Sequence, residues 1–272
     1  MVHLKVENID FGYKDVDVLH DISIDLDGAQ FVSILGPNGV GKSTLIHCFN
    51  NILVPDSGTV SIDDVNIRDI EPKELAKLIA YVPCTSNTSF PMDVADVVLM
   101  GRYPHSGIRK TKNDFRIVHS VLQLMHIDDL ALRSFNELSA GQHQKVMLAR
   151  GLAQGSRILL LDEPTANLDI KHQMEVAHLL KELSVKHDMI VIMICHDINI
   201  ACRYSDRIIM LSGGTVVADG VPDETITEKN IKDVYGVDCV ITTSEGKPHV
   251  VLKDCGYDLI TGNLDFRFQT MS

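Results

Sequence analysis

A glycine-rich stretch, GPNGVGKST at residues 36–44, has the residue types and spacing that bind phosphate groups. It fits the pattern G-x-x-x-x-G-K-(S/T) and lies between an apolar run and a helical pattern that begins near Lys42. Glycines let the backbone turn several N–H groups toward one point, and the positive end of the following helix strengthens the attraction. We therefore expect the following residues to hold the phosphates of a nucleotide: Gly36, Pro37, Asn38, Gly39, Gly41, Lys42, Ser43 and Thr44.

A second group of polar residues, in ILLLDEP at 158–164, follows another apolar run. Lys42 would reach the β- and γ-phosphates, and the Ser43 hydroxyl would bind Mg²⁺. Asp162 could hold the Mg²⁺ shell through water, and Glu163 could polarise the attacking water as general base. The simpler interpretation is a strand that ends in a turn. Two carboxylates would be costly to bury there without a cation, so we favour a catalytic role.

A third motif, LSAGQHQKVMLARGLA from Leu138, lies between the first two motifs in the chain. Ser139 is typical of a helix N-cap, and the N–H groups that follow it at Ala140 and Gly141 are open to an anion. Alone, this would be an ordinary helix start. Together with the other two motifs it resembles the ATP-binding cassette of ABC transporters, whose signature is LSGGQ. Ala140 is a mild departure, and the resemblance covers roughly residues 2–235.

The resemblance implies further site residues. Tyr13, in FGYKD, matches the aromatic residue that stacks on adenine, and Asp169, in ANLD, matches the loop that touches a second subunit. His196, in ICHD, matches the histidine that contacts the γ-phosphate. The alternatives are a surface aromatic and an ordinary histidine at a strand end. In the implied head-to-tail homodimer, each ATP is held by residues 36–44 of one chain and by four signature residues of the other: Ser139, Ala140, Gly141 and Gln142.

The stretch YVPCTSNTSF, residues 81–90, departs from the family pattern. The resemblance implies a glutamine after this strand, whose side-chain oxygen approaches Mg²⁺ and the attacking water. No glutamine occurs within residues 78–90, and Cys84 stands at the end of the strand. A thiol is a weak acceptor and a poor ligand for a hard cation such as Mg²⁺. We expect Glu163 still to support hydrolysis, with Cys84 lowering its rate or its stimulation by a partner, whether the cysteine is natural or engineered.

Composition disfavours several classes of protein. The net charge of -12 over 272 residues repels a phosphate backbone, so we expect no nucleic-acid partner. We expect no membrane span, because no apolar run reaches about 18 residues, and the N-terminus does not have the pattern of a secretory signal. The six cysteines include no C-x-x-C pair, which favours free buried thiols in a reducing compartment. Cys195, His196 and Cys202 lack a fourth nearby ligand for zinc.

Hydrophobic patterns predict a layered α/β fold. Residues 1–30 alternate between apolar and polar, as in half-exposed antiparallel strands. Continuous apolar runs indicate strands covered on both faces, at 31–35, 78–82, 158–161 and 190–195. Helical patterns span 42–53, 112–125 and 172–186, and 207–219 reads as a hairpin. The fold class is therefore α/β: a P-loop NTPase cassette with a mainly parallel core sheet, an N-terminal antiparallel β subdomain and a helical signature subdomain.

The same patterns predict the domain organisation. We expect a nucleotide-binding domain over 1–235, with its helical subdomain at about 86–155. Residues 236–272 form a small C-terminal extension with two short strands. No internal repeat or low-complexity linker divides the chain into two equal parts.

Two further stretches, 93–105 and 234–241, resemble those of importers for iron–siderophores, haem and cobalamin. This implies ATP and Mg²⁺ as cofactors, a polytopic permease dimer, a separate substrate-binding protein, and a peripheral position on the cytoplasmic face of a prokaryotic membrane. The alternative is a soluble cassette ATPase in DNA repair or translation. The single P-loop, the lack of a long coiled coil and the acidic charge disfavour it. A regulator that does not hydrolyse ATP is a third class, against which Glu163 and His196 weigh.

Overall fold

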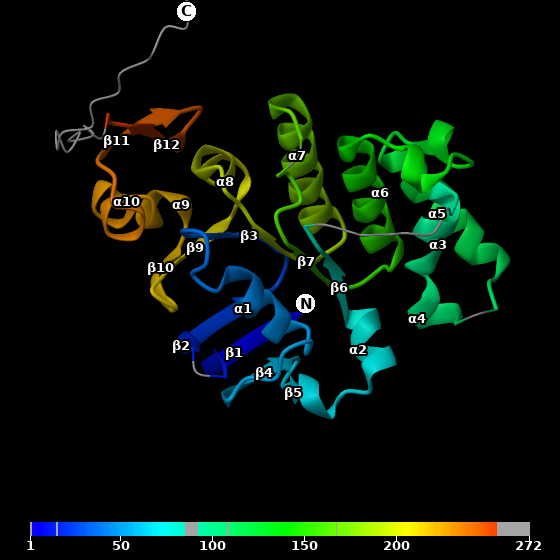
Figure 1. The fold of residues 1–272 in the computed structure, drawn as a ribbon, viewed down its shortest axis with the longest axis horizontal. Coiled ribbons are helices and arrows are strands. Elements are labelled where there is room, and N and C mark those ends of the chain that lie inside the picture. The colour runs from blue at the N-terminus through cyan, green and yellow to red at the C-terminus, as the bar shows by residue number, and fades with distance from the viewer. Residues whose placement is uncertain (1, 15, 85–91, 108, 167, 255–272) are drawn as a thin grey trace, which may run out of the picture.

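A computed structural model describes residues 2–14, 16–84, 92–107, 109–166 and 168–254 (Figure 1). Its central sheet has six strands in the order β10-β9-β3-β8-β7-β6. β6, β7, β8, β3 and β9 run parallel, and β10 pairs antiparallel with β9. This confirms the mainly parallel core. The strand bounds are β3 Gln30–Leu35, β6 Ile79–Val82, β7 Ile158–Leu161, β8 Ile190–Ile194, β9 Arg207–Ser212 and β10 Thr215–Gly220.

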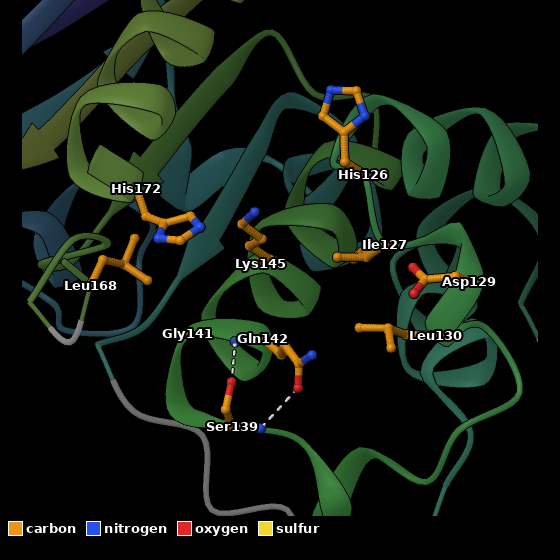
Figure 2. Close-up of a pocket in the computed structure, with 10 residues that line it drawn as sticks. All are labelled: His126, Ile127, Asp129, Leu130, Ser139, Gly141, Gln142, Lys145, Leu168 and His172. Carbon is orange, nitrogen blue, oxygen red and sulfur yellow. Dashed lines mark hydrogen bonds between the residues drawn. The ribbon is translucent and has the colours of Figure 1, made fainter. Parts of the chain in front are cut away.

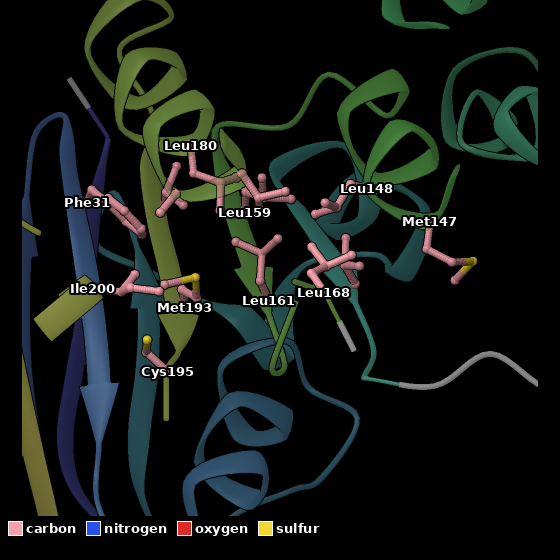
Figure 3. Close-up of a cluster of buried hydrophobic side chains, with 14 of the residues drawn as sticks. Phe31, Met147, Leu148, Leu159, Leu161, Leu168, Leu180, Met193, Cys195 and Ile200 are labelled. Atoms are coloured by element: carbon pink, nitrogen blue, oxygen red, sulfur yellow. The ribbon is translucent and has the colours of Figure 1, made fainter. Parts of the chain in front are cut away.

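Both faces of this sheet are buried, which explains the continuous apolar runs. Successive residues of a strand point to opposite faces. Leu159 and Leu161 therefore pack under the helices on one face, whereas Ile158 and Leu160 pack in a second core against the N-terminal sheet. Figure 3 shows part of the first core, where side chains from the sheet meet Leu180. Burial on both sides leaves little room for polar residues within the strands; Ser33 of β3 is buried there and accepts a hydrogen bond from the Ser205 hydroxyl.

A second sheet, order β2-β1-β4-β5, is antiparallel and confirms the predicted N-terminal subdomain. Its inward residues alternate with exposed ones, as along β2, where Ile22, Ile24 and Leu26 are buried. The bounds are β1 His3–Tyr13, β2 Val16–Asp27, β4 Ser57–Ile62 and β5 Val65–Asn66. Between the two sheets lie α1 Lys42–Phe49 and α2 Pro72–Leu78 (Figure 1).

Helices α3 to α6 gather on one side of the molecule (Figure 1). Their bounds are α3 Val94–Met100, α4 Tyr103–Ser106, α5 Lys112–Leu124 and α6 Ala140–Ala153, with short 3-10 turns at Asp128–Leu130 and Phe135–Glu137. The turn between α3 and α4 lies directly on α6. A Cβ at Gly101 would lie 2.2 Å from the Arg150 carbonyl oxygen, so no side chain fits there.

The remaining helices and strands belong to the second half of the chain, where α7 and α8 connect strands of the sheet and the others come after β10. They are α7 Ile170–Lys186, α8 Ile198–Tyr204, α9 Pro222–Thr225, α10 Glu228–Tyr235, β11 Cys239–Ser244 and β12 Lys247–Leu252, and a further 3-10 turn spans Ile67–Asp69. The predicted hairpin corresponds to β9–β10, and the two predicted short strands to β11–β12. Among the described residues, no helix is long and apolar enough to cross a membrane.

Two predicted boundaries were wrong. The helix expected over 42–53 ends at Phe49, because Asn51 turns to a positive φ of 59° that a right-handed helix cannot contain. The apolar run at 78–82 is not all strand, since Leu78 closes α2 and β6 starts at Ile79. At both boundaries an apolar residue outside the element packs in the core. The hydrophobic pattern in the sequence is therefore longer than the helix or strand itself. The predicted free thiols are confirmed for Cys48, Cys84, Cys195, Cys202 and Cys239.

One ion pair in the helical region is buried. Arg102 Nε lies 3.0 Å from Asp114 Oδ1, and the two residues are only 8% and 2% exposed. Asp114 also accepts hydrogen bonds from the hydroxyl and the backbone N–H of Thr111, 2.7 and 2.8 Å away. These hydrogen bonds and the Arg102 guanidinium hold the pKa of Asp114 well below its usual range. The hydrogen bonds and the ion pair therefore stabilise the fold only while Asp114 is ionised.

Replacing Asp114 by asparagine should lower the free energy of unfolding by about 3 kcal/mol at pH 7, because it leaves the buried guanidinium unpaired. The depressed pKa makes the wild-type contribution present above the unfolded pKa of about 3.9 and lost as the pH falls below it. The difference between the two proteins should therefore narrow below about pH 4. Urea denaturation from pH 3 to 7 measures it.

Glu137→Gln is the matched control for this experiment. It breaks the exposed pair with Arg133, 3.8 Å apart, and should cost less than about 1 kcal/mol. Equal losses for the two variants would contradict a special role for the buried pair.

Candidate functional site

The glycine-rich loop joins the end of β3 to the start of α1, as predicted. Lys42 lies in the first turn of α1 and is only 5% exposed. Its Nζ donates hydrogen bonds to the carbonyl oxygens of Gly36 and Pro37, both at 2.8 Å. Burial lowers the pKa of Lys42, while the negative charges of Glu163 and Asp162 act in the opposite direction. The ammonium thus faces the loop interior, where an anion would be stabilised.

Gly36 is required by space as well as by conformation. Its φ of 150° is in a region that favours glycine, and a Cβ there would lie 2.3 Å from the Leu211 carbonyl oxygen of β9. The loop therefore starts pressed against the neighbouring strand. This contact fixes the position of the first residue of the glycine-rich loop relative to the sheet.

A hollow of about 350 Å³ opens over this loop. Tyr13, at the end of β1, is 49% exposed and makes an edge contact with Phe11, with the ring centroids 4.9 Å apart. Its exposed ring borders the hollow, which is the position expected for a residue that stacks on a base. The lining residues are Tyr13, Val18, Asn38, Gly39, Gly41, Lys42, Ser43, Thr44 and Glu163. The structure thus brings residues far apart in the sequence into one site.

The predicted metal-binding pair lies beside the loop. The Ser43 hydroxyl donates to Asp162 Oδ1 at 3.1 Å, and Asp162 is only 8% exposed. Burial raises the pKa of Asp162. A bound cation would relieve this cost, so the pair fits Mg²⁺, which prefers oxygen ligands. No group of three or more acidic, histidine or cysteine side chains arranged to hold a metal ion is present in the described parts of the chain, so phosphate and water would complete the coordination.

Glu163 lies at the centre of a small polar group. Its Oε1 is 2.6 Å from His196 Nε2, and the Cys84 thiol donates to its Oε2 at 3.7 Å. Its φ is 50°, an unusual conformation for a residue with a side chain. Burial and the nearby carboxylates of Glu163 and Asp162 raise the pKa of the Cys84 thiol, which therefore stays protonated and neutral near pH 7. Cys84 thus donates to the candidate base; the rest of its loop, residues 85–91, is outside the described residues.

The signature motif forms a separate hollow of about 330 Å³ at the start of α6 (Figure 2). Ser139 is the N-cap, as predicted. Its Oγ accepts from the Gln142 N–H at 3.3 Å, and Gln142 Oε1 accepts from the Ser139 N–H at 3.0 Å. The lining residues are His126, Ile127, Asp129, Leu130, Ser139, Gly141, Gln142, Lys145, Leu168 and His172; Ala140 is not among them.

The sequence analysis missed three basic residues at this hollow, His126, Lys145 and His172. Figure 2 shows Lys145 of α6 and His172 of α7 over the signature turn. Lys145 follows Gly141 by four residues, so helical periodicity could have placed both on one face. His172 could not be found in this way, because it comes from another helix. Asp169 caps α7, and it accepts from the His172 N–H and contacts its Nδ1, at 2.9 and 2.8 Å.

The two hollows share no lining residue, so one chain does not join them. The loop hollow offers an ammonium, a carboxylate pair and an exposed ring. The signature hollow offers a helix start and basic side chains. Each hollow has some of the groups that a binding site for a nucleoside triphosphate requires.

A family model described as ABC transporter matches residues 19–166. An uncharacterized ABC transporter ATP-binding protein, MJ0089 of Methanocaldococcus jannaschii, is 46% identical over 91% of this chain and 97% of its own length. The ferric enterobactin transport protein FepC of Escherichia coli is 36% identical, covering 92% and 94%. The hemin import protein HmuV of Thermobifida fusca is 38% identical, covering 89% and 85%.

Two solved structures extend these similarities. A metal-chelate type ABC transporter in an inward-facing conformation aligns with a TM-score of 0.81 at 27% identity, over 93% of this chain and 98% of that one. The dimeric cassette MJ0796, bound to ADP and Pi after hydrolysis, aligns with a TM-score of 0.72 at 29% identity, over 80% and 98%.

Replacing Cys84 by glutamine should raise the ATP hydrolysis rate of the assembled complex by about tenfold, the effect of one additional hydrogen bond of about 1.4 kcal/mol. The amide oxygen would replace a thiol that is a poor partner for Mg²⁺ and water. Steady-state phosphate release measures the rate. Cys84→Ala is the control, because it removes the thiol without adding an amide, and it should stay within about twofold of the parent. Equal rates for the glutamine and alanine variants would refute the expectation.

Proposed function

Because this chain belongs to the ABC transporter family of ATP-binding proteins, we propose that it powers the import of a metal chelate, such as an iron–siderophore complex or haem, through a membrane permease. The family binds ATP and hydrolyses it to drive transport, and this chain is an ATPase. The observation that carries the importer assignment is similarity over about nine-tenths of the chain to relatives that import such compounds. Cobalamin belongs to the same proposed class of cargo.

The proposed hydrolysis uses the residues around the loop hollow. Glu163 accepts a proton from water, the water oxygen bonds to the γ-phosphorus, and the bond from that phosphorus to the β,γ-bridging oxygen breaks, giving ADP and phosphate. Lys42 exchanges its contacts with two backbone carbonyls for contacts with phosphate oxygens. Mg²⁺, held by Ser43 and through Asp162, would neutralise the developing phosphate charge.

His196 has a double role in this proposal. Its Nε2 lies 2.6 Å from Glu163 Oε1, so the histidine contacts one oxygen of the candidate base. When a γ-phosphate enters, His196 transfers its hydrogen bond to a phosphate oxygen. The released Glu163 oxygen can then accept a proton from water. Such an exchange would keep the base inactive until the substrate is in place.

Two copies of the chain would complete each site. The loop hollow and the signature hollow are separate in one chain, so we propose a head-to-tail homodimer in which each ATP lies between them. Lys145 and His172 would then face the nucleotide of the partner chain. A related cassette forms a dimer with ADP and phosphate, which supports the proposal.

The permease would dock at a groove beside β6, the strand that leads to Cys84. The groove holds about 320 Å³ and is lined in part by Ile52, Tyr81 and Gln154. Asn50 Nδ2 and Asn51 Oδ1 line it too, and both are buried without a hydrogen-bond partner in the described structure. A loop of the permease could pair with these amide groups. This would place the chain on the cytoplasmic face of a prokaryotic membrane, with a substrate-binding protein acting on the complex.

We also propose that residues 1–235 form the nucleotide-binding domain, with a helical subdomain at about 86–155 and an extension over 236–272. The segregation of α3–α6 in Figure 1 supports the subdomain.

Mixing two inactive variants should test the shared site. Lys42→Ala damages the loop hollow, and Ser139→Arg damages the signature hollow. Each protein alone should hydrolyse ATP at less than about 1% of the parent rate. After subunit exchange, half of the dimers contain one intact composite site, so about a quarter of the activity should return. If the mixture stays inactive while subunit exchange is demonstrated by native mass spectrometry, the head-to-tail arrangement is wrong.

Transport itself tests the importer assignment. The chain is purified with its permease from native membranes and placed in liposomes, with labelled ferric enterobactin, ferric hydroxamate, haem and cobalamin as cargo. We expect ATP-dependent uptake of one of them, and a loss of about 100-fold for Glu163→Gln, which removes the general base. Glu175→Gln, an exposed change on α7, is the control. Recovery of the chain with ribosomal or DNA-repair proteins and no permease would contradict the assignment.

A further inference from the structure

The C-terminal hairpin, β11 and β12, is not used in the hydrolysis scheme, yet it packs on a helix next to the site. This helix, α8, begins two residues after His196, with Asp197 as its N-cap. The hairpin and α8 lie side by side (Figure 1). Their contact is between segments about fifty residues apart in the sequence.

Asn199 makes the central contact between α8 and the hairpin. Its Nδ2 donates to the Val250 carbonyl oxygen at 3.2 Å, and its Oδ1 accepts from the Val250 N–H at 2.8 Å. The side-chain amide therefore pairs with one residue of β12 as a neighbouring strand would. Both polar groups of Val250 are satisfied by this one side chain, and a residue without an amide could not provide both bonds.

Apolar packing and an ion pair support this contact. Val250 and Cys239 are 5% and 2% exposed, in the same core as Ile200 of α8. At the other end of α8, Arg203 Nη2 lies 2.5 Å from Glu245 in the hairpin turn, where both side chains are exposed. The hairpin is therefore part of the main core.

The position of His196 depends on its two neighbouring elements. On the strand side, the Cys195 N–H donates to the Ile34 carbonyl oxygen at 3.1 Å, which fixes the end of β8 against β3. On the helix side, Asp197 Oδ1 accepts from the Ile200 N–H at 2.9 Å, so the histidine backbone is tied to the first turn of α8. The sheet holds the strand side of His196, and the Asn199 contact links the hairpin to the first turn of α8 on the helix side.

We propose that Asn199 is a positioning residue for hydrolysis: by binding Val250 it fixes the first turn of α8 and keeps His196 at hydrogen-bond distance from Glu163. The effect on rate rests on the proposed function, whereas the effect on the histidine does not. In this proposal the hairpin of the C-terminal extension supports the catalytic site by holding His196 in position during hydrolysis.

A second contact places the residue just before the extension next to the phosphate loop. The hydroxyl of Tyr235, at the end of α10, lies near the backbone of Gly36, and burial raises the pKa of Tyr235 to about 12. The hydroxyl therefore stays neutral near pH 7. The segment from Tyr235 to Val250 contacts both the first residue of the phosphate loop and the helix after His196.

Histidine NMR of the full chain tests the proposal without relying on turnover. In the parent protein, the ring N–H of His196 hydrogen-bonded to Glu163 should give a downfield signal, assigned by its loss in His196→Ala. Asn199→Ala should broaden or shift this signal toward the free-imidazole position. Arg203→Ala is the matched control, because it removes the exposed pair with Glu245 and the cation–π contact with Tyr204 but keeps the Asn199–Val250 bonds, and it should leave the signal unchanged. An unchanged signal in Asn199→Ala overturns the proposal.

Kinetics provide the second measurement. Asn199→Ala should lower kcat about tenfold and leave KM for ATP within about twofold, because the phosphate loop is intact. In a His196→Ala background the same change should have no further effect, whereas an equal further loss would overturn the proposal. If the alanine variant fails to fold in a thermal melt, Asn199→Asp retains an oxygen for the Val250 N–H and should show a smaller kcat loss and signal shift. A parent protein without ATPase activity would refute the proposed function but leave the NMR test intact.

Discussion

The central sheet buries both of its faces, so charged side chains gather where its strands end. β3 ends at the glycine-rich loop, β7 at Asp162 and Glu163, β8 just before His196, and β6 just before Cys84. These strands run parallel and are neighbours in the order β3-β8-β7-β6. Their carboxyl ends therefore meet at one edge of the sheet, where ligands bind in open α/β folds. The phosphate loop, the two carboxylates, His196 and Cys84 therefore share one edge of the sheet.

Burial at this edge also sets the electrostatics. It raises the pKa of Asp162 and lowers the pKa of Lys42, because both charged forms lose water. A metal cation beside Asp162 and a phosphate group beside Lys42 would each compensate for the hydration that the charged side chain has lost. Both shifts show that this edge holds charges at a cost which ligands of opposite charge would relieve.

The helical region is linked to the opposite edge of the sheet, at the start of β6, through Gln154 at the end of α6. Its Nε2 donates to the carbonyl oxygens of Ala76 and Ile79, at 2.5 and 2.8 Å. Its own carbonyl oxygen lies 2.7 Å from His105 Nε2. The helix that begins with the signature therefore ends on β6, the strand that leads to Cys84.

Sequence alone determined the motifs, the parallel core and the antiparallel N-terminal sheet, because each rests on local spacing or on the period of the hydrophobic pattern. It also identified Cys84 as a departure. Only the tertiary structure decided that the Cys84 thiol faces Glu163, that His172 joins the signature hollow, and that Asn199 pairs with Val250. These contacts join segments from different elements, up to about eighty residues apart. Folding brings them together, and no local pattern records them.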